Sequence, residues 1–417
     1  MQKGRISGST GSLLAILALV SLTLLAACGD NTPITNSLLA TSSTPSTTRT
    51  TTGPGVSSTS PTPVPVSTLT GQIKIGALVT LSGNNSPYGI SHKNGYDLAV
   101  EELNNSKFLG SATLQLVTLD DKGEKQEGIS AMTRLVDQEK VVAVLGPTLR
   151  STALAADPIA QQKGIPVLGA SISAANITDM GNFIFQASLP ENGVVPAAIA
   201  QVKTKLNPQK AALVYEATNE YTKGANDVFK AELQKNGITV TANEAYNRGD
   251  TDFHTLFNKI KATQPDLLIV SGLIGETVPL VQQAREVGIT QPILGPTSFN
   301  IPDIYTGGKE AAEGIIAGSA WFSGSTGPKS QVFVAAYKKK YNIEPDQFAT
   351  QAYTGAYLLA TAIRNANSTD PKAIRDALAQ LKDIDSALGN FSFDANRNPV
   401  YDPVIVTVKD GKFQLFQ

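Results

Sequence analysis

Six turns of this sequence carry the side chains best suited to binding a small polar molecule. They lie at 82–89, 146–152, 169–173, 218–221, 271–276 and 295–299. Serine, threonine and asparagine are ordinary turn and helix-capping residues. That role explains Tyr88, Tyr221 and Arg150 less well, and an arginine can bind a carboxylate through two parallel hydrogen bonds. These turns are therefore where binding chemistry is expected, and the alternative for Arg150 is an ordinary solvated arginine.

The residue types that most enzymes need are sparse in this chain. It has two histidines, His92 and His254, and a single cysteine, Cys28. No His/Cys cluster has the spacing of a zinc site, and neither a G-x-S-x-G nor a G-x-x-x-x-G-K-[ST] motif occurs. We therefore expect no catalytic residues, no metal and no cofactor.

Alternating strand and helix patterns position these turns. The expected strands are 73–78, 114–119, 141–145, 165–168, 211–215, 238–240, 267–270 and 293–294. Apolar residues at helical spacing predict helices around 96–103, 129–136, 153–161, 228–233, 253–260 and 278–287, the fifth capped by Asp250 or Thr251. Such alternation predicts an α/β fold with two doubly wound parallel-sheet lobes. Because ligands bind outside the carboxyl ends of parallel strands, the polar turns are where the site is expected.

Composition argues against a nucleic-acid partner. The chain has 34 Lys and Arg against 35 Asp and Glu, a formal charge of −1. Nucleic-acid binding requires a basic run or stripe, and we find none.

The first 28 residues have the pattern of a lipoprotein signal peptide. Lys3 and Arg5 precede an apolar run from Leu13 to Leu25, shorter than the roughly 20 residues that cross a bilayer. The segment ending at Cys28 resembles the bacterial lipobox, which implies cleavage before this cysteine and its lipidation. Acyl chains contribute about 0.8 kcal/mol per buried methylene and would anchor the chain to a membrane. The alternative is an ordinary secretory peptide cleaved near Ala27.

Residues 29–71 are predicted to be a disordered linker. They are mostly Ser, Thr, Pro, Gly and Asn, and cannot bury enough apolar surface to offset their chain entropy. A flexible chain of this length spans about 35 Å root-mean-square. We therefore expect a globular protein tethered to the extracytoplasmic face of a bacterial cell membrane, with the presence of an outer membrane left open.

Several segments together resemble the branched-chain amino acid-binding type of periplasmic solute-binding protein. The similar segments are 73–76, 81–83, 88–89, 95–100, 120–121, 145–147, 160–166, 249–253, 283–285 and 355–357. The resemblance covers residues 72 to 417 and implies a type I periplasmic-binding-protein fold. Two lobes would be joined by a three-crossing hinge that closes around a small ligand.

The resemblance also implies lobe boundaries and partners. Lobe one would combine 72–187 with 319–389, and lobe two 188–318 with 390–417, with crossings near 186–189, 317–321 and 388–390. A monomer would deliver an amino acid or related carboxylate or amide to a membrane ABC permease. The alternative is a ligand-binding sensor subunit for a membrane receptor, without transport.

Candidate ligand-binding residues follow from the same resemblance. Arg150, Ser151 and Thr152 match the turn that offers hydroxyl and N–H groups to a ligand carboxylate, and Ser171 and Ser173 match the turn that binds its ammonium group. Tyr88 and Tyr221 match aromatic positions that wall the pocket.

Two positions depart from the family pattern. Where the family has an aromatic residue, this chain has Leu273 or Ile274. Where the family has the acidic residue that pairs with the ligand's ammonium group, this chain has Thr297. Burying an ammonium group without a counter-ion costs several kcal/mol, whereas a micromolar binder has only about 8 kcal/mol of net binding free energy. Serine hydroxyls with Glu276 or Glu191 would have to compensate, so the amino acid prediction is weakened while Arg150 favours an anion.

Overall fold

Two sheets organise the chain in the computed structural model, which describes residues 67–173 and 176–417. The first sheet has the order β2-β1-β3-β4-β5, and all neighbouring strands in it are parallel. Its strands are β1 (Gln72–Val79), β2 (Thr113–Asp120), β3 (Val144–Leu145), β4 (Val167–Gly169) and β5 (Ile184–Gln186). The predicted signal peptide with Cys28, and the linker up to residue 66, lie outside the described residues.

Both faces of the first sheet are covered by helices. Along β1, Ile75 and Ala77 are buried in one apolar cluster and Leu78 in another, because successive side chains of a strand point to opposite faces. Four helices contribute residues to the first cluster: α1 (Ser86–Asn105), α9 (Pro328–Tyr341), α10 (Gln347–Ala366) and α11 (Pro371–Ala379). Two helices contribute to the second: α2 (Lys125–Thr133) and α3 (Arg150–Lys163). A short π-helical turn, Arg134–Gln138, continues α2. We call this sheet with its helices the first lobe.

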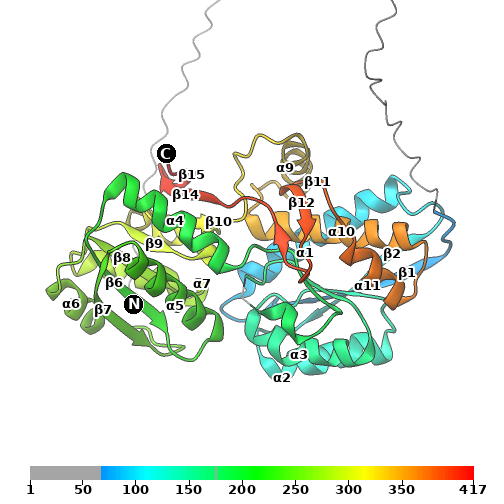
Figure 1. Cartoon of the computed structure of the whole chain (residues 1–417), viewed down its shortest axis with the longest axis horizontal. Coiled ribbons are helices and arrows are strands. Elements are labelled where there is room, and N and C mark those ends of the chain that lie inside the picture. Colours follow the sequence, from blue (N-terminus) through cyan, green and yellow to red (C-terminus); the bar gives the residue numbers. More distant parts are fainter. Residues whose placement is uncertain (1–66, 174–175) are drawn as a thin grey trace, which may run out of the picture. The chain divides into compact units, whose positions relative to one another are not determined.

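The second sheet has the order β15-β14-β10-β9-β8-β6-β7. Its strands are β6 (Lys210–Glu216), β7 (Thr239–Tyr246), β8 (Leu267–Ser271), β9 (Ile293–Gly295), β10 (Ile316–Ser319), β14 (Val404–Lys409) and β15 (Lys412–Leu415). Neighbouring strands in the run β10-β9-β8-β6-β7 are parallel, whereas β14 pairs antiparallel with β10 and with β15. This sheet, green to yellow with its red C-terminal strands in Figure 1, and its helices are called the second lobe.

Helices also cover both faces of the second sheet. Leu213 and Ile269 share one cluster with Phe229 of α5, and Val214 and Val270 face the other. The helices are α4 (Glu191–Leu206) and α5 (Glu220–Lys235) on the first of these faces, and α6 (His254–Ala262), α7 (Ile274–Glu286) and α8 (Asp303–Gly308) on the second. The predicted α/β fold with doubly wound parallel sheets is confirmed. The start of α6 differs from the prediction: the helix begins at His254, and Asp252 rather than Asp250 or Thr251 accepts the free N–H of His254, at 3.1 Å.

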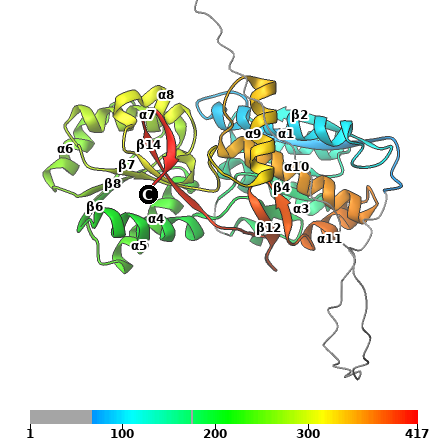
Figure 2. The ribbon, with the colours of Figure 1, turned by 90° about the horizontal axis from the view of Figure 1, so that it is seen from above.

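The chain passes between the two sheets three times. It does so after β5, after β10 and between β13 and β14. A small antiparallel sheet of β11 (Ile384–Ser386), β12 (Gly389–Phe393) and β13 (Pro399–Val400) precedes the last passage. The third passage therefore comes later than the predicted 388–390, because Phe391 and Phe393 are buried in the first-lobe core. Figure 2 shows β12 beside the orange helices of that lobe, apart from β14.

Within residues 67–173 and 176–417, no helix has the length and apolar character that crossing a membrane requires.

Candidate ligand-binding site

A small cavity lies between residues of the two lobes. Its volume is about 40 Å³, and one water molecule needs about 10–15 Å³. The lining residues are Tyr88, Thr148, Leu149, Arg150, Ser171, Ile172, Ser173, Asn219, Tyr221, Leu273, Thr297, Ser298 and Phe348. The cavity is therefore small, with space for about three to four water molecules, and hydroxyls and a guanidinium line it.

Most of the lining residues follow the carboxyl ends of parallel strands. Arg150 follows β3, Ser171 and Ser173 follow β4, Asn219 and Tyr221 follow β6, Leu273 follows β8, and Thr297 and Ser298 follow β9. Parallel strands present these turns at one edge of a sheet. The two edges contribute to the same cavity, at the strand ends where the site is expected.

Arg150 forms one charged part of the site. It is the first residue of α3, whose cap residue Leu149 makes no side-chain capping hydrogen bond among the described residues. The first N–H groups of such a helix carry partial positive charge. Partial burial lowers the pKa of Arg150, and the nearby Glu220 carboxylate opposes this shift. Its Nε is buried without a hydrogen-bond partner in the described part of the chain, so Arg150 has donor capacity for an anion.

A polar cluster of four residues forms another part of the site. Glu191 Oε1 accepts hydrogen bonds from Tyr221 OH (2.7 Å), Ser173 Oγ (3.1 Å), Thr297 Oγ1 (2.5 Å) and the Thr297 N–H (3.2 Å). Ser173 comes from the first lobe and the other three residues from the second. We call these four residues the Glu191 cluster.

Tyr88 connects the lobes beside the cavity. Its hydroxyl donates to the carbonyl of Ser298 (3.0 Å) and accepts from the N–H of Ile274 (2.8 Å). Its ring packs against that of Phe348, with centroids 4.6 Å apart. Burial raises the pKa of Tyr88 well above its ordinary range, so this hydroxyl stays protonated and can donate.

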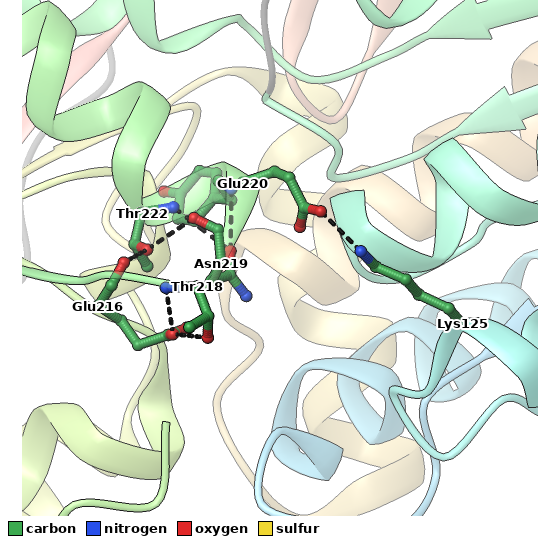
Figure 3. A network of polar contacts seen from close by, with 7 residues as sticks. Lys125, Glu216, Thr218, Asn219, Glu220 and Thr222 are labelled. Carbon is green, nitrogen blue, oxygen red and sulfur yellow. Dashed lines mark hydrogen bonds and ion pairs between the residues drawn. The ribbon is translucent and has the colours of Figure 1, made fainter. Parts of the chain in front are cut away.

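Ion pairs join the lobes near the start of α5. Asn219 caps α5 by accepting from the Tyr221 N–H (2.9 Å), and Glu220 extends from this turn to Lys125 of α2, 2.6 Å away (Figure 3). A second pair of reversed polarity joins Glu124 to Arg248 at 2.9 Å. All four charged residues line a separate hollow that does not include the cavity residues Tyr88 or Ser173.

The structure brings six of the nine predicted ligand-binding residues to the cavity: Tyr88, Arg150, Ser171, Ser173, Tyr221 and Thr297. The other three do not line it. Ser151 lines the hollow with the ion pairs, and Thr152 is fully buried against α2, close to Gly128. Ile274 contributes its N–H to Tyr88, whereas its neighbour Leu273 lines the cavity. The role of all nine residues as ligand contacts remains a prediction.

Sequence reasoning missed two residues of this region as site residues. Phe348 reaches the cavity from the first turn of α10, and no turn pattern marks it. Glu191 had been considered only as compensation for the absent acid. The position of Glu191 directly after a chain crossing, at the start of a helix, was the available signal.

Neither histidine lines the cavity. His92 is fully buried with its Nδ1 3.2 Å from Thr148 Oγ1, and burial lowers its pKa to about 3. His254 is on the exposed side of α6 near Asp252 and Glu286, which raise its pKa. Among the described residues, no group of three His, Cys, Asp or Glu side chains is placed to hold a metal ion.

Comparison with known proteins identifies relatives with the same architecture. The chain is 28% identical over 323 residues to the Leu/Ile/Val-binding protein BraC3 of Rhizobium johnstonii, covering 77% of this chain and 87% of the relative. It resembles the branched-chain amino acid transporter substrate binding protein LivJ of Streptococcus pneumoniae, solved with isoleucine, with a TM-score of 0.79 and 31% identity over 82% of this chain and 98% of that one. An R. palustris solute binding protein solved with benzoate has the same fold, with a TM-score of 0.76, 23% identity and coverage of 83% and 95%.

By name, the first relative binds Leu, Ile and Val, the second is a transporter substrate binding protein, and the third is the solute binding protein of an ABC transporter. Periplasmic solute-binding proteins are not enzymes. The sequence model of the periplasmic binding protein family matches residues 72–412. This match covers most of the chain and agrees with both sheets and with the relatives. The chain therefore belongs to the periplasmic binding protein family.

Proposed function

We propose that this protein is the solute-binding lipoprotein of an ABC importer and captures an amino acid or a related small carboxylate or amide. One observation carries the proposal: polar strand-end side chains of both lobes meet around a single small cavity. A ligand that contacts both lobes stabilises the arrangement in which they are together, and this is how such proteins close around a solute. A membrane permease would then receive the closed form.

The carboxylate of the ligand is assigned to Arg150 and the start of α3. The guanidinium can form charge-assisted hydrogen bonds, each contributing about 1.5–3 kcal/mol. The uncapped N–H groups of the helix add a favourable dipole. Leu149, Ile172, Leu273 and Phe348 supply apolar surface to the same cavity, which suits a solute with a small apolar side chain.

The first test is a thermal-shift screen of the full chain against amino acids, short amides, urea and carboxylic acids including benzoate. A ligand at one hundred times its dissociation constant adds about 2.7 kcal/mol of stability, so a binding solute raises the melting temperature clearly. We expect at least one amino acid or small carboxylate to do so. An unchanged melting temperature with every solute of the panel would contradict the proposal.

The second test uses Arg150→Ala, with calorimetric titration of the solute found by the screen. Losing one charge-assisted contact is expected to weaken binding at least tenfold. Arg134→Ala is the matched control, because Arg134 is an exposed residue of the π-helical turn and pairs with Glu139. Equal affinities of Arg150→Ala and the control would show Arg150 to be a solvated residue at the edge of the cavity.

The lipid anchor is tested separately at Cys28. We expect the full chain to fractionate with membranes and Cys28→Ser to become soluble, since the acyl chains would be lost. An unchanged distribution would favour an ordinary secretory peptide. The importer role predicts that growth on the bound solute requires this protein together with a permease.

A further inference from the structure

We propose that Glu191 is the counter-ion for a primary ammonium group, so that the cavity selects α-amino acids over carboxylic acids lacking that group. This inference rests on the proposed function and names the substrate class of the same cavity. It assigns the selectivity to a residue at the start of α4, whereas the resemblance placed the acid where Thr297 stands.

Glu191 is deeply buried, and only one of its two carboxylate oxygens has hydrogen-bond partners among the described residues. The residue is 4% exposed. Oε1 accepts four hydrogen bonds from Ser173, Tyr221 and Thr297, whereas Oε2 is buried with no partner among the described residues. No lysine, arginine or histidine in that part of the chain forms an ion pair with it. A buried carboxylate normally has such a partner, so a cation from outside the chain is the missing component.

The hydroxyl groups of the cluster present acceptors to the cavity. Ser173, Tyr221 and Thr297 all line it, and each hydroxyl has a single proton to donate. When these protons point to Glu191 Oε1, only oxygen lone pairs remain for a ligand. An ammonium group donates three hydrogen bonds and accepts none, so it matches this surface. A ligand carboxylate or carbonyl would meet acceptors and a negative charge.

The two charged parts of the site thus differ in sign. Arg150 at the start of α3 is positive, and the Glu191 cluster is negative. A zwitterion with both an ammonium and a carboxylate can satisfy both parts of the same cavity. A desamino acid can satisfy only the first.

A purely structural role for Glu191 explains less. As the first residue of α4, a carboxylate is favoured by the helix dipole, and Oε1 ties together the turns at Ser173 and Thr297. Neither function requires a buried Oε2 without a partner, in a residue whose three hydrogen-bonded neighbours line the cavity. Burial raises the pKa of Glu191, and a bound ammonium would favour the ionised form, which gives a second readout besides affinity.

The experiment is calorimetric titration of the full chain with matched solute pairs. The probes are L-leucine with 4-methylpentanoate, which lacks the ammonium group, L-alanine with propanoate, and benzoate. We expect each L-amino acid that binds to bind at least a hundredfold more tightly than its desamino partner. Glu191→Gln should weaken amino acid binding at least tenfold and change desamino acid binding by less than threefold.

Matched variants separate selectivity from folding. Glu276→Gln is the control, because Glu276 is also a buried glutamate in the first turn of a helix and does not line the cavity. Glu191→Asp should retain a preference for the ammonium, since it keeps the charge. If Glu191→Gln fails to fold, the wild type still gives a test: amino acid affinity should rise with pH, as Glu191 ionises, more than desamino acid affinity does.

The outcomes distinguish the two proposals. Equal losses for both members of a pair in Glu191→Gln, or no pH difference between them, would overturn the counter-ion role and leave solute capture intact. Binding of benzoate or propanoate without any amino acid would do the same. If no solute from this panel or from the broader screen binds, solute capture itself fails and the counter-ion role with it.

Discussion

The hydroxyl of Tyr88, on the first helix of the first lobe, accepts a 2.8 Å hydrogen bond from the backbone N–H of Ile274, the first residue of α7 in the second lobe. The same hydroxyl donates to the Ser298 carbonyl at 3.0 Å. One side chain beside the cavity thus satisfies two backbone groups of the opposite lobe. Its contribution exists only while the lobes are together, which makes it a contact that favours ligand retention.

Tyr88→Phe is therefore expected to weaken solute binding about fivefold, with faster dissociation, because a net hydrogen bond contributes roughly 0.5–1.5 kcal/mol. Stopped-flow dissociation and calorimetry measure this. Tyr215→Phe is the control, since Tyr215 forms no side-chain hydrogen bond within the described residues and lies on β6. An unchanged dissociation rate in Tyr88→Phe would show that this contact does not hold the lobes.

Gly275→Ala is expected to hinder closure without harming the fold. A Cβ at Gly275 would lie 2.8 Å from the Cβ of Asn84 in the opposite lobe, and overpacking of this kind costs about 1–3 kcal/mol. Affinity should fall about tenfold, while alanine in place of glycine favours the helix. Gly193→Ala is the matched control, because it lies in the first turn of α4 with open space around the position, as far as the described residues show. Equal affinities of the two variants would contradict the lobe contact.

Reversing the charge of Lys125 should speed ligand dissociation about two- to fivefold, because it replaces the pair with Glu220 by repulsion. The double variant Lys125→Glu/Glu220→Lys should restore the original rate. Raising the salt concentration should reduce the difference, since both side chains are exposed. The pair would be irrelevant to closure if the single and double variants dissociated equally fast.

Asp346 should make stability depend on pH. It caps α10 and accepts a 2.6 Å hydrogen bond from Ser91, yet its burial raises its pKa from 3.8 to about 6. Between pH 4 and 6 the folded chain therefore holds a proton that the unfolded chain has lost. This group's contribution to the free energy of unfolding falls as pH rises through that window, by up to about 3 kcal/mol.

Asp346→Asn should remove this loss, so the variant should gain stability relative to wild type between pH 4.5 and pH 7. Urea unfolding at the two pH values measures the difference. Asp370→Asn is the control, because Asp370 caps α11 in the same way but is exposed. A constant difference between Asp346→Asn and wild type at both pH values would contradict the assigned pKa.

The sequence predicted the parts of the site that depend on strand order. Ser173, Tyr221 and Thr297 each follow a β-branched or apolar strand, and the carboxyl ends of parallel strands must share an edge. Glu191 and Phe348 were not predicted as site residues because they lie at helix starts whose position depends on the lobe crossings. A pattern of local periodicity carries no information on such long-range placement.

The third crossing was misplaced for a related reason. Phe391 and Phe393 alternate along a short strand, and period two identifies a buried face. It does not identify which lobe buries that face. Their rings pack near Phe185 and Tyr401 of the first-lobe core, a choice made by tertiary packing.

The most direct test is a crystal structure of the full chain grown with the solute that gives the largest thermal shift. The account predicts one solute molecule in the cavity, contacting Arg150 from the first lobe and the Glu191 cluster through Tyr221 or Thr297 from the second. Solute density outside this cavity, or on one lobe with Tyr88 separated from Ile274, would contradict it.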